Sequence, residues 1–426
     1  MINGKVGLIM NHEKEWTWRD TGNMETALRA FNAFGALFGL DRGSFKPEQL
    51  ITAAQAKCGF DDFGDGRFRE GLDVICDSYR GEARFNLLGR ITAQRYLVDL
   101  LVNRLRIIDW AKRHPDVGEQ KVRRPWIVIG LPRSGTTLAS TLIDLDTHTR
   151  SPLSWEVDAP IPPATLATRY SDPRIAQSAR VIEQTVRIMP SFPAIHHLDS
   201  RAPHECIMLL RYDFRSLALQ ALALCPSYGK WYVGCDMGSA FALHKTILQI
   251  WQSEIATRYW NLKAPNHLHH IDDLMAAYPY ARVIWMHRDP AICVPSITSL
   301  MMTMQRPMSK AADPAASGAH FNWMYRTGIE RTMRYDDQSA DSRWCYHLHY
   351  DALMRDPVGA LRAAYAHFGD EMEPEHEARM AAWVRQRPKN TFGRHKYSPE
   401  DFGLRADELH AQYGDYIGRY SITLET

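Results

Sequence analysis

No stretch of this sequence is apolar for long enough to cross a lipid bilayer. The longest apolar runs, 30–40 and 217–225, fall well short of the roughly 18 residues that a span requires. The seven cysteines are scattered without a C-x-x-C pair, so neither a zinc knuckle nor a disulfide framework is indicated. An excess of one charge is also lacking, because 51 Lys and Arg face 49 Asp and Glu. With too short an apolar N-terminal stretch for a signal peptide, we expect a cytoplasmic protein with no transmembrane segment and no nucleic-acid partner.

Two regions of different character divide the 426 residues. Residues 1–122 are predicted to form a helical N-terminal region, because apolar side chains recur at helical spacing along 90–111. A stretch rich in Pro, Gly and charge at 114–125 is typical of a linker. In the region 123–426, short apolar strands alternate with helical patterns, which predicts an α/β domain with a parallel sheet flanked by helices. The strands are expected at 126–130, 258–263, 282–288 and 344–349.

The segment Gly130-Leu-Pro-Arg-Ser-Gly-Thr-Thr137 lies between an expected strand and an expected helix. In that setting, backbone N–H groups and the helix N-terminus bind anions. Gly130 and Gly135 have the spacing of a nucleoside-triphosphate P-loop, but Thr136 replaces its lysine and the positive charge is at Arg133. Such a loop suits a donor that needs no bridging metal, although a divergent metal-dependent kinase and a plain strand–turn–helix are alternatives. The residues expected to contact the anion are Pro132, Arg133, Ser134, Gly135, Thr136 and Thr137.

A second pattern follows about 150 residues after the loop, in HRDPAICVPSITSL (287–300). Arg288 ends an expected strand, and Ser296 lies at the start of the next helix. A guanidinium fork and a hydroxyl near a helix N-terminus can bind a phosphate dianion. Arg-x₇-Ser alone is common and usually means a surface salt bridge and a helix cap, but the preceding loop favours a phosphate site.

These motifs resemble those of sulfotransferases that use PAPS (3′-phosphoadenosine 5′-phosphosulfate). PRSGTT (132–137) is similar to their 5′-phosphosulfate loop, and 287–300 is similar to their 3′-phosphate element. Arg133 matches the protein-tyrosine sulfotransferases, whereas cytosolic members usually have lysine there. Weaker matches are LKAPNHL (262–268), HLHYDALMRDP (347–357) and GRHKYSPEDFGL (393–404). The resemblance, over about 123–405, implies a P-loop-type fold, PAPS as donor, adenosine 3′,5′-bisphosphate as product and no metal.

The resemblance also implies roles for residues outside the two main motifs. Tyr350 would border the adenine, and Arg394 or Lys396 would add positive charge at the 3′-phosphate. Lys263, in the segment before the second motif, is the candidate cation for the bridging or leaving oxygen. The histidine cluster 267–270 is not expected to hold a metal, because neighbouring positions on a helix point apart.

The base that removes the acceptor's proton is left open between two residues. His267 has an imidazole that titrates near neutrality by default, as a general base requires. Glu156 lies about twenty residues after the loop, where protein-tyrosine sulfotransferases carry a catalytic Glu, and burial beside Trp155 would raise its pKa. His197 and His204 are the next candidates.

We therefore predict a sulfotransferase that transfers the sulfuryl group of PAPS to a hydroxyl of a small-molecule acceptor, possibly lipid-like or phenolic, by in-line displacement without a metal. The segment 194–216, which mixes aromatic, histidine and acidic residues, is interpreted as a wall of the acceptor site. A divergent P-loop kinase and a non-catalytic nucleotide-binding protein are the alternative functions. The identity of the acceptor and the oligomeric state stay open.

Overall fold

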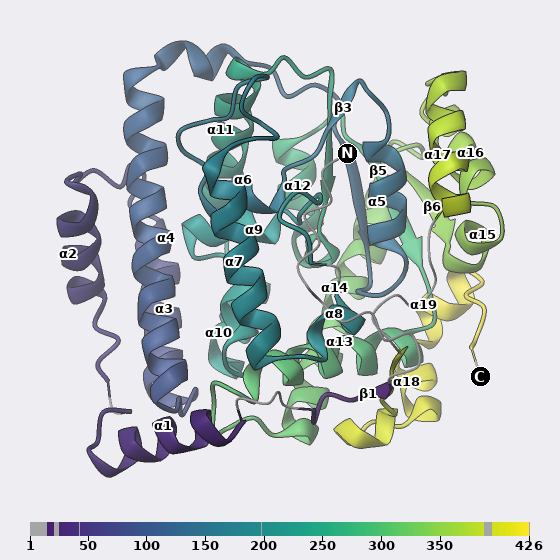
Figure 1. Cartoon of the computed structure of the whole chain (residues 1–426). Helices are drawn as coiled ribbons and strands as arrows, with labels where there is room; N and C mark the ends of the chain where they lie inside the picture. The colour runs from purple at the N-terminus through teal and green to yellow at the C-terminus, as the bar shows by residue number, and fades with distance from the viewer. Residues whose placement is uncertain (1–14, 21–24, 42, 197, 387–393, 426) are drawn as a thin grey trace.

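A sheet of five parallel strands lies at the centre of the molecule, in the order β3-β4-β2-β5-β6 (Figure 1). The computed structural model describes residues 15–20, 25–41, 43–196, 198–386 and 394–425. The sheet strands are β2 (Trp126–Gly130), β3 (Thr149–Arg150), β4 (Tyr259–Lys263), β5 (Arg282–His287) and β6 (Cys345–His349). A separate parallel pair joins β1 (Glu15–Trp16) to β7 (Arg394–His395). The predicted parallel sheet flanked by helices is confirmed.

Helices cover both faces of this sheet. Side chains alternate between the faces of a strand, so Trp126 and Val128 of β2 pack on one side, and Ile127 and Ile129 pack on the other. The first side is covered by α5 (Thr136–Asp144), α15 (Tyr350–Arg355), α16 (Pro357–His367) and α17 (Pro374–Gln386). The second is covered by α11 (Gly238–Glu254), α12 (Ile271–Ala277), α13 (Pro290–Gln305) and α14 (Pro314–Gln338). Burial on both faces explains why β2, WIVIG in the sequence, is a continuous apolar run.

The N-terminal helices pack against the same core as the sheet. They are α1 (Glu25–Leu37), α2 (Pro47–Cys58), α3 (Phe68–Gly81) and α4 (Leu87–Arg113). The predicted helix 90–111 corresponds to α4, which begins after Asn86, whose side chain accepts a hydrogen bond from the backbone N–H of Gly89. Leu72 and Leu101 belong to the same apolar cluster as Trp285 of β5. The regions 1–122 and 123–426 thus share one core.

A buried charge cluster ties α4 to the rest of the molecule. Asp213 is completely buried, and its two carboxylate oxygens bind Arg104 of α4 at 2.7 Å and Arg215 at 3.0 Å. The hydroxyl of Ser239 donates a further hydrogen bond of 2.6 Å to the same carboxylate. This network connects α4 of the N-terminal region to the segment 213–239.

A long insertion, 151–258, separates β3 from β4 in sequence although the two strands are neighbours in the sheet. Its elements before α11 are α6 (Ser154–Asp158), α7 (Pro173–Ile188), α8 (Phe192–Ile195), α9 (Ile207–Leu210), η2 (Arg211–Asp213), η3 (Leu217–Ala221) and α10 (Pro226–Gly234). The remaining elements are η1 (Pro115–Glu119), η4 (Pro265–His270), η5 (Pro399–Phe402), α18 (Ala406–Gln412) and α19 (Gly414–Arg419). Among the described helices, none combines the length and apolarity of a membrane span.

Candidate functional site

Four neighbouring strands end at one edge of the sheet, and a predicted site residue or loop stands at each end. The P-loop-like segment 130–137 follows β2, and Lys263 is the last residue of β4. Arg288 follows β5, and Tyr350 follows β6. Because the strands are parallel, all four lie at the carboxyl edge, where open α/β sheets bind ligands. The strand order gives their sequence across the sheet: Lys263, the loop, Arg288 and then Tyr350.

The loop has the backbone shape of an anion cradle. Gly130 and Gly135 both have positive φ, 139° and 93°. A Cβ on Gly130 would lie 2.5 Å from the carbonyl oxygen of Met286, so no larger residue fits there without a shift. The buried hydroxyl of Ser134 donates to the carbonyl of Leu131 at 2.6 Å and closes the turn. The loop therefore runs directly into the N-terminus of α5, where backbone N–H groups can bind an anion.

The side chains of the loop divide between its interior and its surface. Pro132 and Thr136 are buried, whereas Arg133 and Thr137 are exposed. The Arg133 guanidinium donates to the carbonyl of Ile195, at the end of α8, at 2.7 Å. The loop arginine thus reaches across to the 151–258 insertion.

Lys263 connects the loop to Glu205, which is not among the residues predicted for the site. Its Nζ lies 3.2 Å from Oγ1 of Thr137 and 2.8 Å from Oε1 of Glu205. The backbone N–H of Cys206 donates to the Lys263 carbonyl at 2.8 Å, which fixes this part of the insertion to the end of β4. Glu205 lies within 194–216, the predicted acceptor-side wall, but the sequence around it carries no motif that would single it out.

Two histidines lie close to Glu205. Burial lowers the pKa of His196 to about 3 and that of His204 to about 4, so both are neutral imidazoles. The backbone N–H of Glu205 donates to Nδ1 of His204 at 2.8 Å, which places the proton of that ring on Nε2. Burial acts to raise the pKa of Glu205, but the opposing charge of Lys263 outweighs it and brings the pKa below its ordinary value.

Glu156 and His267, the two bases predicted from the sequence, do not contact Lys263 or the loop through a described hydrogen bond. Glu156 is buried and holds Arg150 at 2.9 Å with one oxygen, while the other accepts the backbone N–H of Leu153 at 3.1 Å. Both oxygens of Glu156 are thus engaged in an internal ion pair and the cap of α6. His267 is also buried beside the ring of Phe241, its Nε2 has no described hydrogen-bond partner, and burial lowers its pKa to about 3. His197 lies outside the described residues.

Arg288 is engaged by a carboxylate from the far end of the chain. Its Nε and Nη2 donate to the two carboxylate oxygens of Glu425 at 2.6 and 2.8 Å. Its Nη1 donates to the carbonyl of Arg133 at 2.7 Å, and its guanidinium lies over the Tyr350 ring, 3.8 Å from the centroid. Burial alone would lower the pKa of Arg288, but its bonds to Glu425 raise it. Glu425 therefore occupies the guanidinium fork that would receive an anionic ligand.

The other residues predicted for the 3′-phosphate lie in different places. Ser296 is buried in α13, close to the side chain of Tyr397. Lys396 pairs with Glu15 at 2.6 Å at the surface. Arg394 begins β7, and its side chain lies outside the described part of the molecule. Arg288 thus contacts the loop, whereas Lys396 forms its ion pair with Glu15 of β1.

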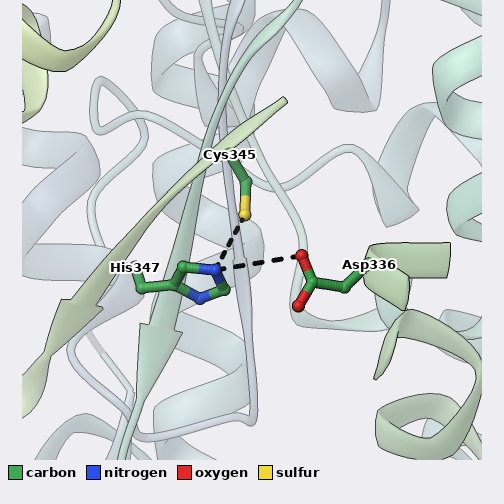
Figure 2. Close-up of side chains that lie close together, drawn as sticks. All are labelled: Asp336, Cys345 and His347. Atoms are coloured by element: carbon green, nitrogen blue, oxygen red, sulfur yellow. Dashed lines mark hydrogen bonds and ion pairs between the residues drawn. The ribbon is translucent and has the colours of Figure 1, made fainter. Parts of the chain in front are cut away.

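Asp336, Cys345 and His347 form a small cluster beside the sheet (Figure 2). Nε2 of His347 lies 3.5 Å from Sγ of Cys345 and 4.0 Å from the Asp336 carboxylate. That carboxylate already accepts hydrogen bonds from Trp344, Arg419 and Tyr420, at 2.7–2.8 Å. Burial also raises the pKa of the Cys345 thiol well above its usual range, and metal binding requires the thiolate. We assign this cluster to the packing of α14, β6 and α19, and not to a metal.

Comparisons with known proteins agree on one family. A family model described as "Sulfotransferase family" matches residues 125–374. Two curated relatives, each named omega-hydroxy-beta-dihydromenaquinone-9 sulfotransferase Stf3, from Mycobacterium bovis and Mycobacterium tuberculosis, are 25% identical over 253 residues. That match covers 58% of this chain and 62% of the relatives' length.

Two solved structures are similar over most of their length. The sulfotransferase STF9 from Mycobacterium avium has a TM-score of 0.81 and 29% identity, covering 89% of this chain and 97% of its own. The sulfotransferase STF1 from M. tuberculosis H37Rv has a TM-score of 0.76 and 29% identity, covering 86% and 97%. The likeness therefore includes the helical N-terminal region as well as the sheet.

Proposed function

This chain belongs to the sulfotransferase family, and on that premise we propose that it transfers the sulfuryl group of PAPS to a hydroxyl of an acceptor. The order of side chains along the sheet edge is the observation that carries the proposal. Lys263, the loop, Arg288 and Tyr350 follow one another on adjacent strand ends. This order suits a donor whose sulfuryl group lies near Lys263, whose 5′-phosphate lies in the loop, and whose 3′-phosphate and adenine lie near Arg288 and Tyr350.

Each group along the edge has a task in an in-line displacement. The loop N–H groups, with the hydroxyls of Thr136 and Thr137, can donate to the phosphate and sulfuryl oxygens. Lys263 can neutralise the charge that develops as the bond between sulfur and the 5′-phosphate oxygen breaks. Transfer to the acceptor oxygen then leaves adenosine 3′,5′-bisphosphate. Catalysis of this kind depends mainly on positioning and on charge stabilisation.

We propose that the acceptor is a small molecule, lipid-like or phenolic. The name of the curated relatives describes a hydroxylated menaquinone derivative as their substrate. In this chain the 151–258 insertion stands at the Lys263 end of the edge, where Cys206 and Glu205 contact the last residue of β4. An acceptor hydroxyl directed at the sulfuryl group would approach from this side.

Titration calorimetry with adenosine 3′,5′-bisphosphate and with ATP tests the proposal most directly. We expect binding of the bisphosphate and little or none of ATP, followed by turnover of labelled PAPS in a screen of acceptor classes. Preferred binding of ATP would favour the kinase alternative. Binding of the bisphosphate without turnover on any acceptor class would favour the non-catalytic alternative.

Selectivity for the 3′-phosphate should depend on Arg288. A charge-assisted hydrogen bond contributes about 1.5–3 kcal/mol, so we expect Arg288→Ala to weaken adenosine 3′,5′-bisphosphate at least about tenfold. The affinity for 5′-AMP should barely change, because that ligand lacks the 3′-phosphate. Calorimetry of both ligands measures the difference, and equal losses would contradict the assignment.

Glu425→Gln is the matched variant from the other side of the same ion pair. The Glu425 carboxylate must leave Arg288 before a phosphate can take its place. Partly exposed ion pairs contribute about 0.2–1 kcal/mol, so this variant should bind adenosine 3′,5′-bisphosphate about 1.4- to 5-fold more tightly. Its affinity for 5′-AMP should be unchanged. Weaker bisphosphate binding would mean that the Glu425 side chain supports the site.

Turnover should not require a divalent metal. Thr137 occupies the loop position whose hydroxyl binds Mg²⁺ in nucleoside-triphosphate P-loops, but here the ammonium of Lys263 lies 3.2 Å from that hydroxyl. A second cation at that place would be repelled by the first. We expect the initial rate of PAPS turnover to be the same with EDTA as with Mg²⁺; loss of activity in EDTA that Mg²⁺ restores would contradict this.

A further inference from the structure

Glu205 lies beside the proposed sulfuryl site and is held there by three separate contacts. Its Oε1 accepts from Lys263 at 2.8 Å, and the same ammonium lies 3.2 Å from Thr137 of the loop. The adjacent Cys206 N–H bonds to the Lys263 carbonyl, and the N–H of His204 bonds to the carbonyl of Pro152, both at 2.8 Å. The position of the carboxylate is therefore fixed by the end of β4, like that of Lys263 itself.

The groups around Glu205 are one cation and several neutral imidazoles. Lys263 faces it from β4, neutral His196 and His204 flank it within the insertion, and neutral His267 lies beyond in η4. One carboxylate oxygen binds Lys263, and no described residue donates a hydrogen bond to the other, Oε2. An ionised carboxylate whose second oxygen accepts from no described residue can receive a proton from a hydroxyl placed beside Lys263.

Neither predicted base, Glu156 or His267, combines a contact with Lys263 and a free proton-accepting atom. Glu156 has an arginine on one oxygen and a backbone N–H on the other. His267 has a free Nε2, but its buried surroundings disfavour the imidazolium that proton transfer would create. Glu205 is the acidic side chain that is bonded to Lys263.

We infer that Glu205 is the general base that takes the proton of the acceptor hydroxyl. The inference rests on the proposed function and names a further catalytic residue within it. When the donor's sulfuryl oxygens compete for the Lys263 ammonium, the Glu205 carboxylate loses its partner and becomes more basic. The acceptor's O–H proton then passes to Glu205 while the acceptor oxygen forms a bond to sulfur. The bond from sulfur to the 5′-phosphate oxygen breaks, and its electron pair stays on the phosphate.

The test compares two acceptors of different acidity, octan-1-ol and 4-nitrophenol, with PAPS at a pH where the phenol is already ionised. An ionised acceptor has no proton to lose, so a base is needed only for the alcohol. We expect Glu205→Gln to lower kcat with the alcohol by about 10²–10⁴-fold and kcat with the phenolate less than about tenfold. Glu205→Asp, which keeps a carboxylate, should retain more activity on the alcohol than Glu205→Gln does. Glu156→Gln serves as the matched carboxylate control and should affect both acceptors alike.

Equal losses with both acceptors would overturn the inference, because Glu205 would then act only by positioning Lys263. A loss below about tenfold on the alcohol would overturn it as well. Calorimetry with adenosine 3′,5′-bisphosphate, expected to be unchanged, shows that each variant is folded and binds nucleotide. A wild-type enzyme that binds this nucleotide but consumes no PAPS with either acceptor would overturn the proposed transfer to small hydroxyl compounds, and the role of Glu205 with it.

Discussion

Replacing Lys263 with alanine should lower kcat by about 10²–10³-fold, the usual cost of removing one preorganised charge-stabilising group. Lys263 is almost fully buried at the end of β4, so its ammonium acts with little screening by water. Donor affinity should change only a few-fold, because in the proposed arrangement the loop and Arg288 bind the phosphates. Initial rates over a range of PAPS concentrations, together with calorimetry of adenosine 3′,5′-bisphosphate, separate the two effects.

Lys57→Ala is the control for Lys263→Ala. Lys57 pairs with Asp99 on the surface of the N-terminal helices, and its side chain is half exposed. Its removal should leave kcat and donor affinity unchanged. A Lys263→Ala variant with near-normal kcat would mean that this lysine only balances the charge of Glu205.

The largest effect on stability is expected from Asp213→Ala. Removing one partner of a buried ion pair commonly costs about 3–5 kcal/mol, because the remaining charge is left buried and uncompensated. Here the buried guanidinium of Arg104 would lose its carboxylate partner, and that of Arg215 would keep only its ion pair with Glu70. Urea denaturation followed by circular dichroism should show a much lower midpoint for this variant.

Asp407→Asn provides the comparison for Asp213→Ala. Asp407 pairs with Arg405, and both side chains are exposed on the surface. Its unfolding midpoint should match that of the wild type. If Asp213→Ala also unfolds at the wild-type midpoint, the buried cluster contributes no net stability, and the apolar contacts of α4 alone hold the N-terminal region.

Strands β2, β4, β5 and β6 could be predicted because the pattern of each lies within a few consecutive residues. The run 126–130 is apolar at every position, and the predicted strands 258–263, 282–288 and 344–349 each match the structure to within one residue at either end. Their order in the sheet could not be read from the sequence, because it depends on long crossovers. The two-residue strand β3, which pairs with the first two residues of β4, is too short to leave a pattern.

The candidate-site residues that the sequence pointed to are those that adjoin a glycine-rich turn or the end of a strand. The loop, Lys263, Arg288 and Tyr350 all satisfy that condition, and the structure brings them to one edge. Glu205 does not, because its partner Lys263 is 58 positions away. Glu156 lay at a favourable spacing, but its buried partner Arg150 could not be recognised as such. The engagement of Arg288 by Glu425 spans 137 positions and has no local signal.

In the proposed function, the donor and the acceptor contact different stretches of the chain. The proposed donor contacts come from the ends of β2, β5 and β6, where the backbone is fixed by strand pairing on both sides or by helices. The approach to Lys263 is bordered instead by the 151–258 insertion: Glu205 of this insertion contacts Lys263, whereas its helix α11 packs in the core. On the proposed function, substitutions in the stretch around Glu205 would change the choice of acceptor and leave the proposed nucleotide contacts in place, provided that Glu205 is retained.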